Sequence, residues 1–466
     1  MFKITEILKA TQGRLINKGK QDGFDAVGID SRTLTAGQIF VAIKGDNFDG
    51  HDFINDSIKK GAACIILELD YDNLSSKGKI KQLSQCFPEV TFIGVGDTVK
   101  ALGDLARFHR DRFDIPVVAI TGSNGKTTTK DMVAFVLSKR FNVLKTEGTK
   151  NNQIGVAMAL LGLNKRHQAA VLEFGTNHFG EIAYLTGISS PTIGVITNIG
   201  PSHLEFLRDL KGVLREKCSL IDNLRHPCIG VLNADDELLS GLLSSGAEQS
   251  VLFGYGIKNS SDFSAGSVKT TSAGTTFIMN QRNAFNLKTP GSHNVYNALA
   301  AIGVAVILGM SNDDISAAIS SFTFPSGRLN ILTVNDATII DDSYNSNPLS
   351  LGKALDTLSD FKTKGRRIMV MGDMLELGDS EDEFHKKAGR DVSQVCDVLV
   401  AVGKLSELTA KAAKACGFDT DKIFLCESSQ QAREILIKKV SPKKDDVILI
   451  KGSRRMKMEE AIPKKV

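Results

Sequence analysis

Short apolar runs alternate with longer segments of helical spacing along much of this chain. The run at residues 115–120 is followed by apolar residues at helical spacing from Met132 to Leu137. The runs at 169–172 and 192–197 begin similar units. Short apolar runs bounded by turns are typical of buried strands, and their alternation with helices is typical of a mostly parallel sheet. The pattern therefore predicts an α/β fold, with helices such as 98–112 covering the sheet.

The alternation also divides the chain into three predicted domains, at 1–95, 96–323 and 324–466. A hinge-like Pro325-Ser326-Gly327 turn separates the last two. Strands of the outer two domains are predicted at 38–43, 63–67 and 91–95, and at 338–340, 368–371, 399–402, 423–425 and 447–450. The third domain reads as Rossmann-like, but it has no G-x-G-x-x-G turn, so we expect no dinucleotide there.

Residues 229–287 depart from this pattern. Their apolar runs are short and are separated by clusters of Gly, Ser and Asn. Such spacing favours antiparallel pairing, so we expect a small antiparallel addition to the central domain.

Composition limits the possible functions. The 466 residues are 42% apolar and 24% charged, with a net charge of +4 and no Trp. This balance is ordinary for a globular protein and gives no basic footprint for nucleic acid. No apolar run approaches the length of a membrane span, and the N-terminus does not resemble a signal peptide. Seven scattered Cys form no C-x-x-C pair, which favours reduced thiols in a cytoplasmic protein.

The strongest chemical signal lies between the strand at 115–120 and the helix that follows it. Strand, glycine turn, Lys-Thr and helix is the layout of a phosphate-binding loop. The glycines permit a tight turn, the lysine reaches phosphate oxygens, and the threonine offers a hydroxyl to Mg²⁺. Ile120 replaces the first glycine of the general pattern, so the loop is a subtype. Its predicted nucleotide-binding residues are Gly122, Ser123, Asn124, Gly125, Lys126, Thr127 and Thr128.

Polar residues also follow the two later strands of the central domain. Glu173 follows the run at 169–172, and His203 lies shortly after the run at 192–197. Ligands bind beyond the carboxyl ends of strands in open α/β sheets. With the phosphate loop at the same predicted edge, these residues favour metal and phosphate chemistry. In the first domain, Ser31 and Arg32 occupy a turn beside a strand, where they could hold a phosphate or simply face solvent.

The order of motifs resembles the Mur ligases, the ATP-dependent amide ligases of peptidoglycan precursor synthesis. The resemblance covers essentially the whole chain. It rests on the phosphate loop and on these stretches: Asp30-Ser31-Arg32, Gly50-His51-Asp52-Phe53, Asn151-Asn152-Gln153-Ile154-Gly155, Glu173-Phe174-Gly175, Thr197–Glu205, Gly291–Asn297, Ser326-Gly327-Arg328, Asp341–Pro348, Val370–Gly378 and Lys451-Gly452-Ser453-Arg454.

The resemblance implies a role for individual residues. Lys126 would hold the β and γ phosphates of ATP, and Thr127 and Glu173 would ligate a first Mg²⁺. His203 would help to bind a second Mg²⁺. Lys217 would be carbamylated by CO₂ and become an acid-like ligand. The remaining nucleotide contacts would come from Asn294, Arg328 and Asp342.

The resemblance also implies the substrates. It is greatest to the family members that join D-alanyl-D-alanine to UDP-N-acetylmuramoyl-tripeptide. We also expect a cytoplasmic protein that acts as a monomer. The UDP-sugar peptide would contact Ser31, Arg32, Asn151 and Asn152. Tyr344, Asn345 and Asn347 bring hydrogen-bonding groups without net charge, which suits a small dipeptide amine.

Three positions depart from the resemblance, and three readings of the function remain open. Thr149, Phe174 and Ala157 stand where Asn, Met and Pro are usual, and Thr149 bears on substrate recognition. The first reading is an amide ligase. The second is a nucleotide-dependent switch, which would not need Lys217, Asp342 or a third domain. The third is another Mur ligase or a folylpolyglutamate synthase. The absence of an Asp-Asn-Pro-Arg stretch and the presence of the UDP-sugar motifs argue against this third reading.

Overall fold

The computed structural model describes residues 2–45, 48–69, 78–271, 274–334 and 336–463. Contacts between Cα atoms divide the chain into two compact units. The first unit contains Met1–Val117, Leu144–Phe174 and Ala183–Pro191. The second unit contains Val118–Val143, Gly175–Ile182 and Thr192–Val466.

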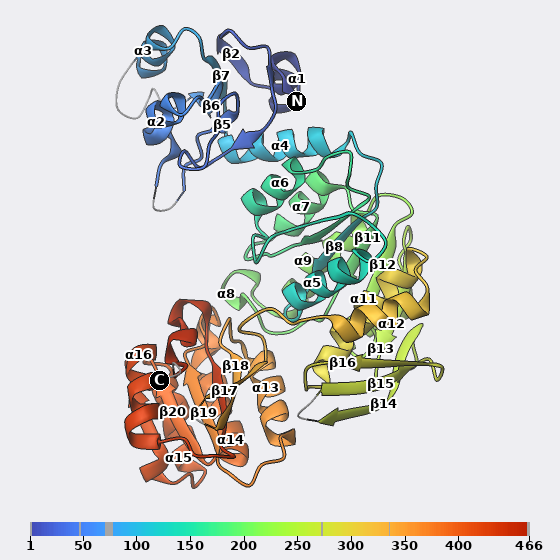
Figure 1. Ribbon diagram of the computed structural model, residues 1–466, viewed down its shortest axis with the longest axis vertical. Helices are drawn as coiled ribbons and strands as arrows, with labels where there is room; N and C mark the ends of the chain where they lie inside the picture. Colours follow the sequence, from blue (N-terminus) through green and yellow to red (C-terminus); the bar gives the residue numbers. More distant parts are fainter. Residues whose placement is uncertain (1, 46–47, 70–77, 272–273, 335, 464–466) are drawn as a thin grey trace. The chain divides into compact units, whose positions relative to one another are not determined.

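The N-terminal part of the first unit is built on a five-stranded sheet with the order β2-β7-β6-β5-β4 (Figure 1). Its three central strands are parallel and buried, as their continuous apolar runs predict, whereas β2 is antiparallel to β7. A separate antiparallel pair joins β1 to β3. The elements are β1 (Phe2–Lys3), α1 (Ile4–Thr11), β2 (Arg14–Asn17), β3 (Gly23–Phe24), β4 (Val27–Gly28), β5 (Ile39–Val41), η1 (Gly50–Phe53), α2 (Ile54–Lys59), β6 (Cys64–Glu68), α3 (Lys79–Cys86) and β7 (Thr91–Val95).

The remainder of the first unit is largely helical. Helix α4 (Thr98–Arg110) begins at the side-chain cap of Asp97 and ends two residues before the predicted end. The side chain of Arg110 is fully buried and donates to the carbonyls of Ser189 and Phe113, so it is committed to the packing of this unit. The other elements that lie wholly or mainly in this unit are β9 (Val143–Lys145), α6 (Gln153–Leu161), β10 (Ala169–Glu173) and α7 (Glu181–Ser189).

In the second unit the first sheet has the strand order β16-β15-β14-β13-β12-β11-β8. Strands β8 (Val117–Thr121), β11 (Ile193–Ile196), β12 (Ile229–Asn233) and β13 (Val251–Gly256) are parallel. The expectation for residues 229–287 is therefore only partly right, because β12 and β13 extend the parallel sheet. Antiparallel pairing is confined to β14 (Phe263–Thr271), β15 (Gly274–Met279) and β16 (Asn283–Leu287).

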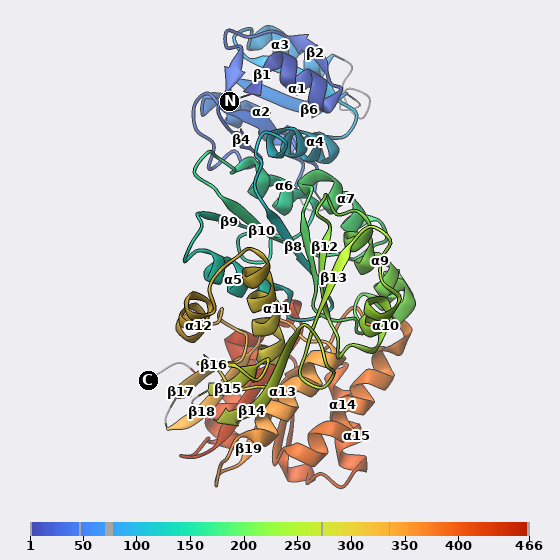
Figure 2. The ribbon, with the colours of Figure 1, turned by 90° about the vertical axis from the view of Figure 1, so that its right-hand side faces the viewer.

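Helix α11 (His293–Ile307) packs on this sheet against β12, β13 and β14 (Figure 2). Its small, apolar and almost entirely buried side chains allow a close approach. The other helices of this part of the chain are α5 (Lys126–Leu137), α8 (Leu204–Leu207), α9 (Leu210–Asp222), α10 (Glu237–Ser245) and α12 (Asn312–Ser321).

The C-terminal sheet has the order β17-β18-β22-β19-β20-β21, with an apolar core on each face. All its pairs are parallel except that of β17 with β18, and this antiparallel edge strand was not predicted. The elements are β17 (Asn330–Val334), β18 (Ala337–Asp342), α13 (Pro348–Asp360), β19 (Arg367–Gly372), η3 (Gly378–Ser380), α14 (Glu381–Val395), β20 (Val398–Val402), α15 (Ser406–Ala415), η4 (Thr420–Lys422), β21 (Ile423–Cys426), α16 (Ser429–Ile435), η5 (Leu436–Val440), β22 (Val447–Lys451), η6 (Arg454–Met456) and η7 (Met458–Ala461).

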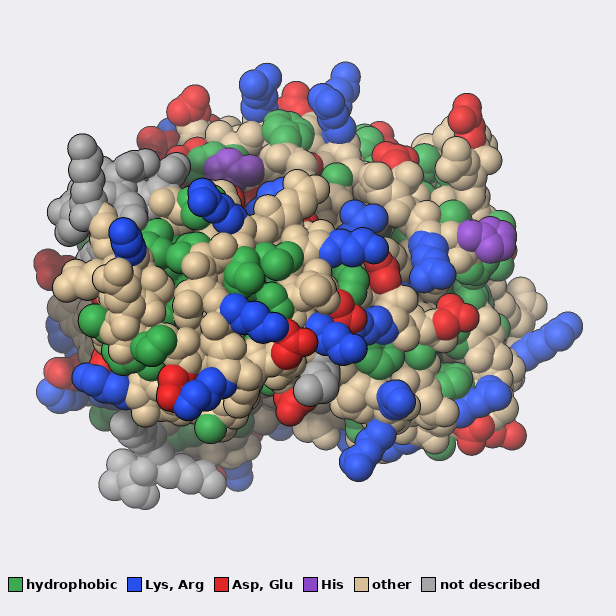
Figure 3. Space-filling view, turned by 90° about the horizontal axis from the view of Figure 1, so that it is seen from above, with side chains coloured by type: hydrophobic (Ala, Val, Ile, Leu, Met, Phe, Trp, Pro, Cys, Tyr) green, Lys and Arg blue, Asp and Glu red, His purple; other side chains and the backbone are tan. Residues whose placement is uncertain are grey.

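The surface charge, the helix lengths and the cysteines bear on the class of protein. On the face drawn in Figure 3, positive and negative side chains are interspersed, so this face has no continuous basic area. Among the residues that the structure describes, no helix combines the length and apolar character needed to cross a bilayer. All seven cysteines are free thiols.

Candidate active site

The predicted phosphate loop joins β8 to α5, as the sequence pattern indicated. Gly122 and Gly125 have φ angles of +143° and +79°, which side chains rarely adopt. A Cβ atom on Gly122 would also lie 1.9 Å from the hydroxyl oxygen of Thr197. Both glycines are therefore required by the backbone, and the turn places several N–H groups before the first turn of α5.

A segment after β11 braces this loop from the side. The Asn124 backbone N–H donates to the Asn198 side-chain oxygen at 2.9 Å, and the Thr197 hydroxyl donates to the Asn124 carbonyl at 2.5 Å. The Ser123 hydroxyl donates to the Gly200 carbonyl at 2.9 Å. Sequence reasoning did not assign Thr197 or Asn198 a role, because these contacts join positions more than 70 residues apart. They hold the loop in one shape.

Lys126 begins α5 and lies over the loop. Its ammonium group donates to the Gly122 carbonyl at 2.8 Å and reaches the Ser123 carbonyl at 3.4 Å. Thr127 and Thr128, the next two residues, are buried in the first helical turn. The loop therefore combines a cation, a hydroxyl and a helix N-terminus, the groups that bind a polyphosphate.

Two residues from beyond the Pro325 hinge contact the loop. The guanidinium of Arg328 donates to the Thr127 hydroxyl at 2.9 Å. The amide of Asn347 donates to the Asn124 side-chain oxygen at 2.8 Å. Asn347 also caps α13 by accepting a bond from the Ser350 N–H at 2.9 Å. The second unit thus joins predicted nucleotide residues and predicted amine-site residues in one network.

A buried ion pair lies at the base of the loop that follows β18. The Lys451 ammonium is 2.5 Å from the Asp342 carboxylate and 2.9 Å from the Asn345 carbonyl. The Lys451 side chain is only 3% exposed, so the pair fixes the start of the loop. The Asn345 side chain accepts bonds from the backbone N–H groups of Ser346 and Arg454. Lys451 was noted only as part of a motif, and its position is a finding of the structure.

Lys217 lies on α9 and is 1% exposed. Burial, and secondarily the charge of Lys126, hold the pKa of Lys217 well below its usual value. The preceding residue, Glu216, accepts bonds from the N–H groups of Gly180 and Ile182 at 2.7 and 2.8 Å. These bonds tie residues 180–182, which belong to the second unit, to the helix that carries Lys217.

His203 precedes α8 with a φ of +53°, in the left-handed region that few residues other than glycine adopt. Its ring nitrogen Nδ1 lies 3.0 Å from a carboxylate oxygen of Glu376, which also has a positive φ, of +64°. The neighbouring imidazole lowers the pKa of Glu376. Glu376, from the motif after β19, thus lies beside the predicted metal ligand His203.

Glu173 ends β10 in the first unit and is 1% exposed. Its Oε1 accepts a bond from the Asn151 amide at 2.8 Å, whereas its buried Oε2 has no hydrogen-bond partner. A buried carboxylate oxygen without a donor is costly unless a cation or proton satisfies it. The residue therefore fits a hard metal ion such as Mg²⁺. Within the described residues, no group of three or more His, Cys, Asp or Glu side chains could hold a metal unaided.

The other predicted substrate residues are less constrained. Arg32 is exposed and forms a forked pair with Asp30, and this hydrogen bonding lowers the pKa of Asp30 to about 2. Ser31 lies in the same turn. Asn152 caps α6 by accepting a bond from the Gly155 N–H.

Asn294, predicted to contact adenine, is buried in the first turn of α11. Its side-chain oxygen accepts from the Asn297 amide at 3.1 Å, and its own amide donates to the Pro290 carbonyl. Asn297 in turn accepts a bond from the Thr129 hydroxyl on α5. The predicted adenine residue is thus connected to the helix of the phosphate loop.

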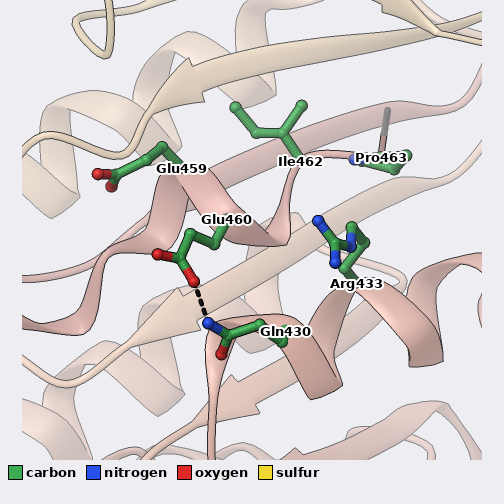
Figure 4. A pocket seen from close by; sticks show the side chains of 6 residues that line it. All are labelled: Gln430, Arg433, Glu459, Glu460, Ile462 and Pro463. Atoms are coloured by element: carbon green, nitrogen blue, oxygen red, sulfur yellow. Dashed lines mark hydrogen bonds between the residues drawn. The ribbon is translucent and has the colours of Figure 1, made fainter. Parts of the chain in front are cut away.

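A cavity of about 620 Å³ lies elsewhere, near the end of the chain (Figure 4). None of its lining residues belongs to the predicted site, and we do not assign it a role. They are Gln430, Arg433, Glu459, Glu460, Ile462 and Pro463.

The glycine loop, its lysine and its helix N-terminus have the geometry of a nucleotide-binding site, and comparison with known families identifies the class of protein. The Mur ligase family catalytic domain matches residues 24–110. The Mur ligase middle domain matches 120–305, and the Mur ligase glutamate ligase domain matches 327–454. The chain belongs to the Mur ligase family.

Individual relatives cover nearly the whole chain. A protein of Bacillus subtilis named UDP-N-acetylmuramoyl-tripeptide–D-alanyl-D-alanine ligase is 33% identical over 98% of this chain and 97% of its own length. The protein of that name in Escherichia coli is 34% identical over 99% and 97%. A crystal structure of MurF from Acinetobacter baumannii matches with a TM-score of 0.87 at 31% identity, covering 98% and 97% of the two chains. MurF from Thermotoga maritima in complex with ADP matches with a TM-score of 0.79 at 28% identity, covering 94% and 96%. These matches confirm the predicted α/β class and three-domain architecture.

Proposed function

We propose that this protein is an ATP-dependent ligase that joins D-alanyl-D-alanine to UDP-N-acetylmuramoyl-tripeptide in peptidoglycan precursor synthesis. The products are the pentapeptide precursor, ADP and phosphate. The observation that carries the proposal is the pair of contacts that Arg328 and Asn347 make with the phosphate loop. They connect a nucleotide site to the loop after β18, where an amine substrate would bind. The relatives named above carry the same activity in their names.

The reaction follows from the chemistry of a carboxylate, which is a poor acyl donor. The terminal carboxylate of the tripeptide attacks the γ-phosphorus of ATP, the bond to ADP breaks, and an acyl phosphate forms. The amine of D-alanyl-D-alanine then attacks the acyl carbon, a proton leaves the nitrogen, and phosphate departs. Two anions must approach each other, so Lys126 and the loop N–H groups offset their repulsion.

We further propose that two Mg²⁺ ions accompany ATP. When bound, they neutralise charge that develops on the phosphoryl oxygens. In the second unit, Thr127, His203 and a carbamylated Lys217 would offer ligands, with Asn294, Arg328 and Asp342 contacting the nucleotide. In the first unit, the unpaired Oε2 of Glu173 is suited to a cation.

The predicted domains 1–95, 96–323 and 324–466 would serve the UDP-sugar, ATP and the amine respectively. Ser31, Arg32, Asn151 and Asn152 are the proposed contacts with the UDP-sugar peptide. Asn345 and Asn347 are the proposed contacts with D-alanyl-D-alanine. We propose that the enzyme acts as a monomer in the cytoplasm, where its nucleotide substrates are made.

Phosphate release tests the function directly. With ATP and UDP-N-acetylmuramoyl-tripeptide, we expect release to require D-alanyl-D-alanine and to equal the amide formed. Single amino acids in its place should give little product. ATP turnover that needs neither substrate would support a nucleotide-dependent switch and contradict the ligase.

Substitution of Asn347 tests the amine site. We expect Asn347→Ala to raise the KM for D-alanyl-D-alanine far more than the KM for ATP. We also expect a loss of about 1 kcal/mol in stability, because the variant removes the cap of α13. Asn347→Ser is the matched control, since its hydroxyl can cap α13 and it loses the amide donor without adding a charge beside the phosphate loop. Equal changes in both KM values for Asn347→Ala would contradict a role in amine binding.

A further inference from the structure

Tyr344, in the loop after β18, has two guanidinium groups near its ring. The Arg328 guanidinium carbon is 4.4 Å from the centre of the ring, and that of Arg454 is 5.5 Å away. Both distances are within the range of cation–π attraction, and the shorter one belongs to Arg328. Arg454 also pairs with Glu459 at 2.8 Å.

The backbone brings Tyr344 close to the hinge that carries Arg328. The Tyr344 N–H donates to the Gly327 carbonyl at 3.1 Å. Gly327 has a φ of +73°, and a Cβ atom there would lie 3.2 Å from the Cβ of Tyr344. The hinge therefore needs glycine at this position to allow the ring and the guanidinium to meet.

The other side of Arg328 faces the nucleotide site. Its Nη2 donates to the hydroxyl of Thr127, which is buried in the first turn of α5. A long arginine side chain loses considerable rotamer freedom when it is fixed in one geometry. A ring face beneath the guanidinium restricts that freedom before the nucleotide arrives, which is a form of preorganisation.

We propose that Tyr344 is a positioning residue for Arg328, holding its guanidinium against Thr127 of the phosphate loop by a cation–π contact. This assignment rests on the proposed function. It differs from the sequence-based expectation, in which Tyr344 contacts D-alanyl-D-alanine directly. In this proposal the ring face of Tyr344 holds the Arg328 guanidinium, and the phenol hydroxyl has no part in it.

Two substitutions separate the ring from the hydroxyl. Tyr344→Leu should raise the KM for ATP roughly five- to thirty-fold, the range that a cation–π contact of about 1–2 kcal/mol corresponds to. Its KM for D-alanyl-D-alanine should stay within about twofold of wild type. Tyr344→Phe keeps the ring face and should leave both values within about twofold. Because the side chain is only half-buried, we expect these variants to fold. Tyr344→Met replaces the leucine variant if it does not.

A double-mutant cycle with Arg328→Met shows whether Tyr344 acts through Arg328. In the Arg328→Met background, Tyr344→Leu should have no further effect on ATP. Additive effects, or an unchanged KM for ATP in Tyr344→Leu, would overturn the proposal. So would a raised KM for D-alanyl-D-alanine in Tyr344→Phe, which would show that the hydroxyl binds the dipeptide.

Calorimetric titration with ADP and Mg²⁺ measures ADP affinity for the same four proteins of the double-mutant cycle, without requiring ligation. Coupled losses in ADP affinity would support the positioning role even if no amide were formed. A failure of the ligase assay alone would therefore count against the proposed function and leave the role of Tyr344 to the titration. Independent losses in affinity would count against the positioning role.

Discussion

Lys126→Ala is expected to abolish ligation while leaving the fold intact. Its side chain is half-buried at the start of α5, and its ammonium group donates to the backbone carbonyls of Gly122 and Ser123. Truncation should therefore cost little packing energy. The charge would follow the phosphoryl group as it transfers, so its loss should raise the barrier by several kcal/mol.

Phosphate release and amide formation measure this effect, and circular dichroism confirms the fold. Lys139→Ala is a matched control, because Lys139 is an exposed lysine just beyond the other end of α5. The control should retain the wild-type rate. If Lys126→Ala kept more than about a tenth of the rate, the lost stabilisation would be below about 1.4 kcal/mol, too little for this role.

Local patterns in the sequence were sufficient to predict the phosphate loop and most strands. The strand at 115–120 and the loop glycines depend on neighbouring residues alone, and the structure has them at the predicted place. The same holds for the strands near residues 368–371 and 399–402, which are apolar on both faces. Such elements are specified by burial and backbone geometry within about ten residues.

Elements whose partners are distant in sequence were harder to predict. Residues 229–256 form two parallel strands because β12 adds to β11 and β13 adds to β12. A short apolar run has the same appearance in parallel and antiparallel sheets, so glycine and serine spacing alone misled the prediction. Strand β17 pairs at an edge and exposes much of its length, so it lacks the apolar signal of a central strand.

The contacts within the candidate site were also beyond prediction from local sequence. Arg328 and Thr127 form a hydrogen bond although they are 201 positions apart, and Lys451 and Asp342 form an ion pair although they are 109 positions apart. No spacing rule predicts such pairs, and the resemblance to Mur ligases supplied only the residues. The helix cap at Asn347 has a local signal, because Pro348 follows it at the first helical position. The bond from Asn347 to Asn124 has no such local signal.

The surroundings of Lys217 give a physical reason for the proposed carbamylation. An ammonium group cannot ligate a metal, whereas a carbamate offers oxygen atoms. The lowered pKa of Lys217 favours the neutral amine, which is the form that attacks CO₂. The nitrogen forms a bond to carbon and loses a proton, which leaves an N-carboxylate anion. Glu216 keeps the adjoining loop in place, so the lysine is presented from a rigid helix.

Lys217→Ala is therefore expected to reduce the rate of ligation by about a hundredfold or more, through loss of a ligand that supports the developing charge. Short carboxylates such as acetate or propionate should restore part of the rate, because they can enter the space left by the side chain and supply an oxygen ligand. Lys211→Ala removes an exposed lysine from the same helix and should leave the rate unchanged. With ¹³CO₂, the wild-type protein should show a carbamate carbon resonance that Lys217→Ala lacks. Full activity of Lys217→Ala would show that ligation does not need a carbamate at this position. The same resonance in that variant would show that the signal does not come from Lys217. Either result would contradict the proposed carbamate.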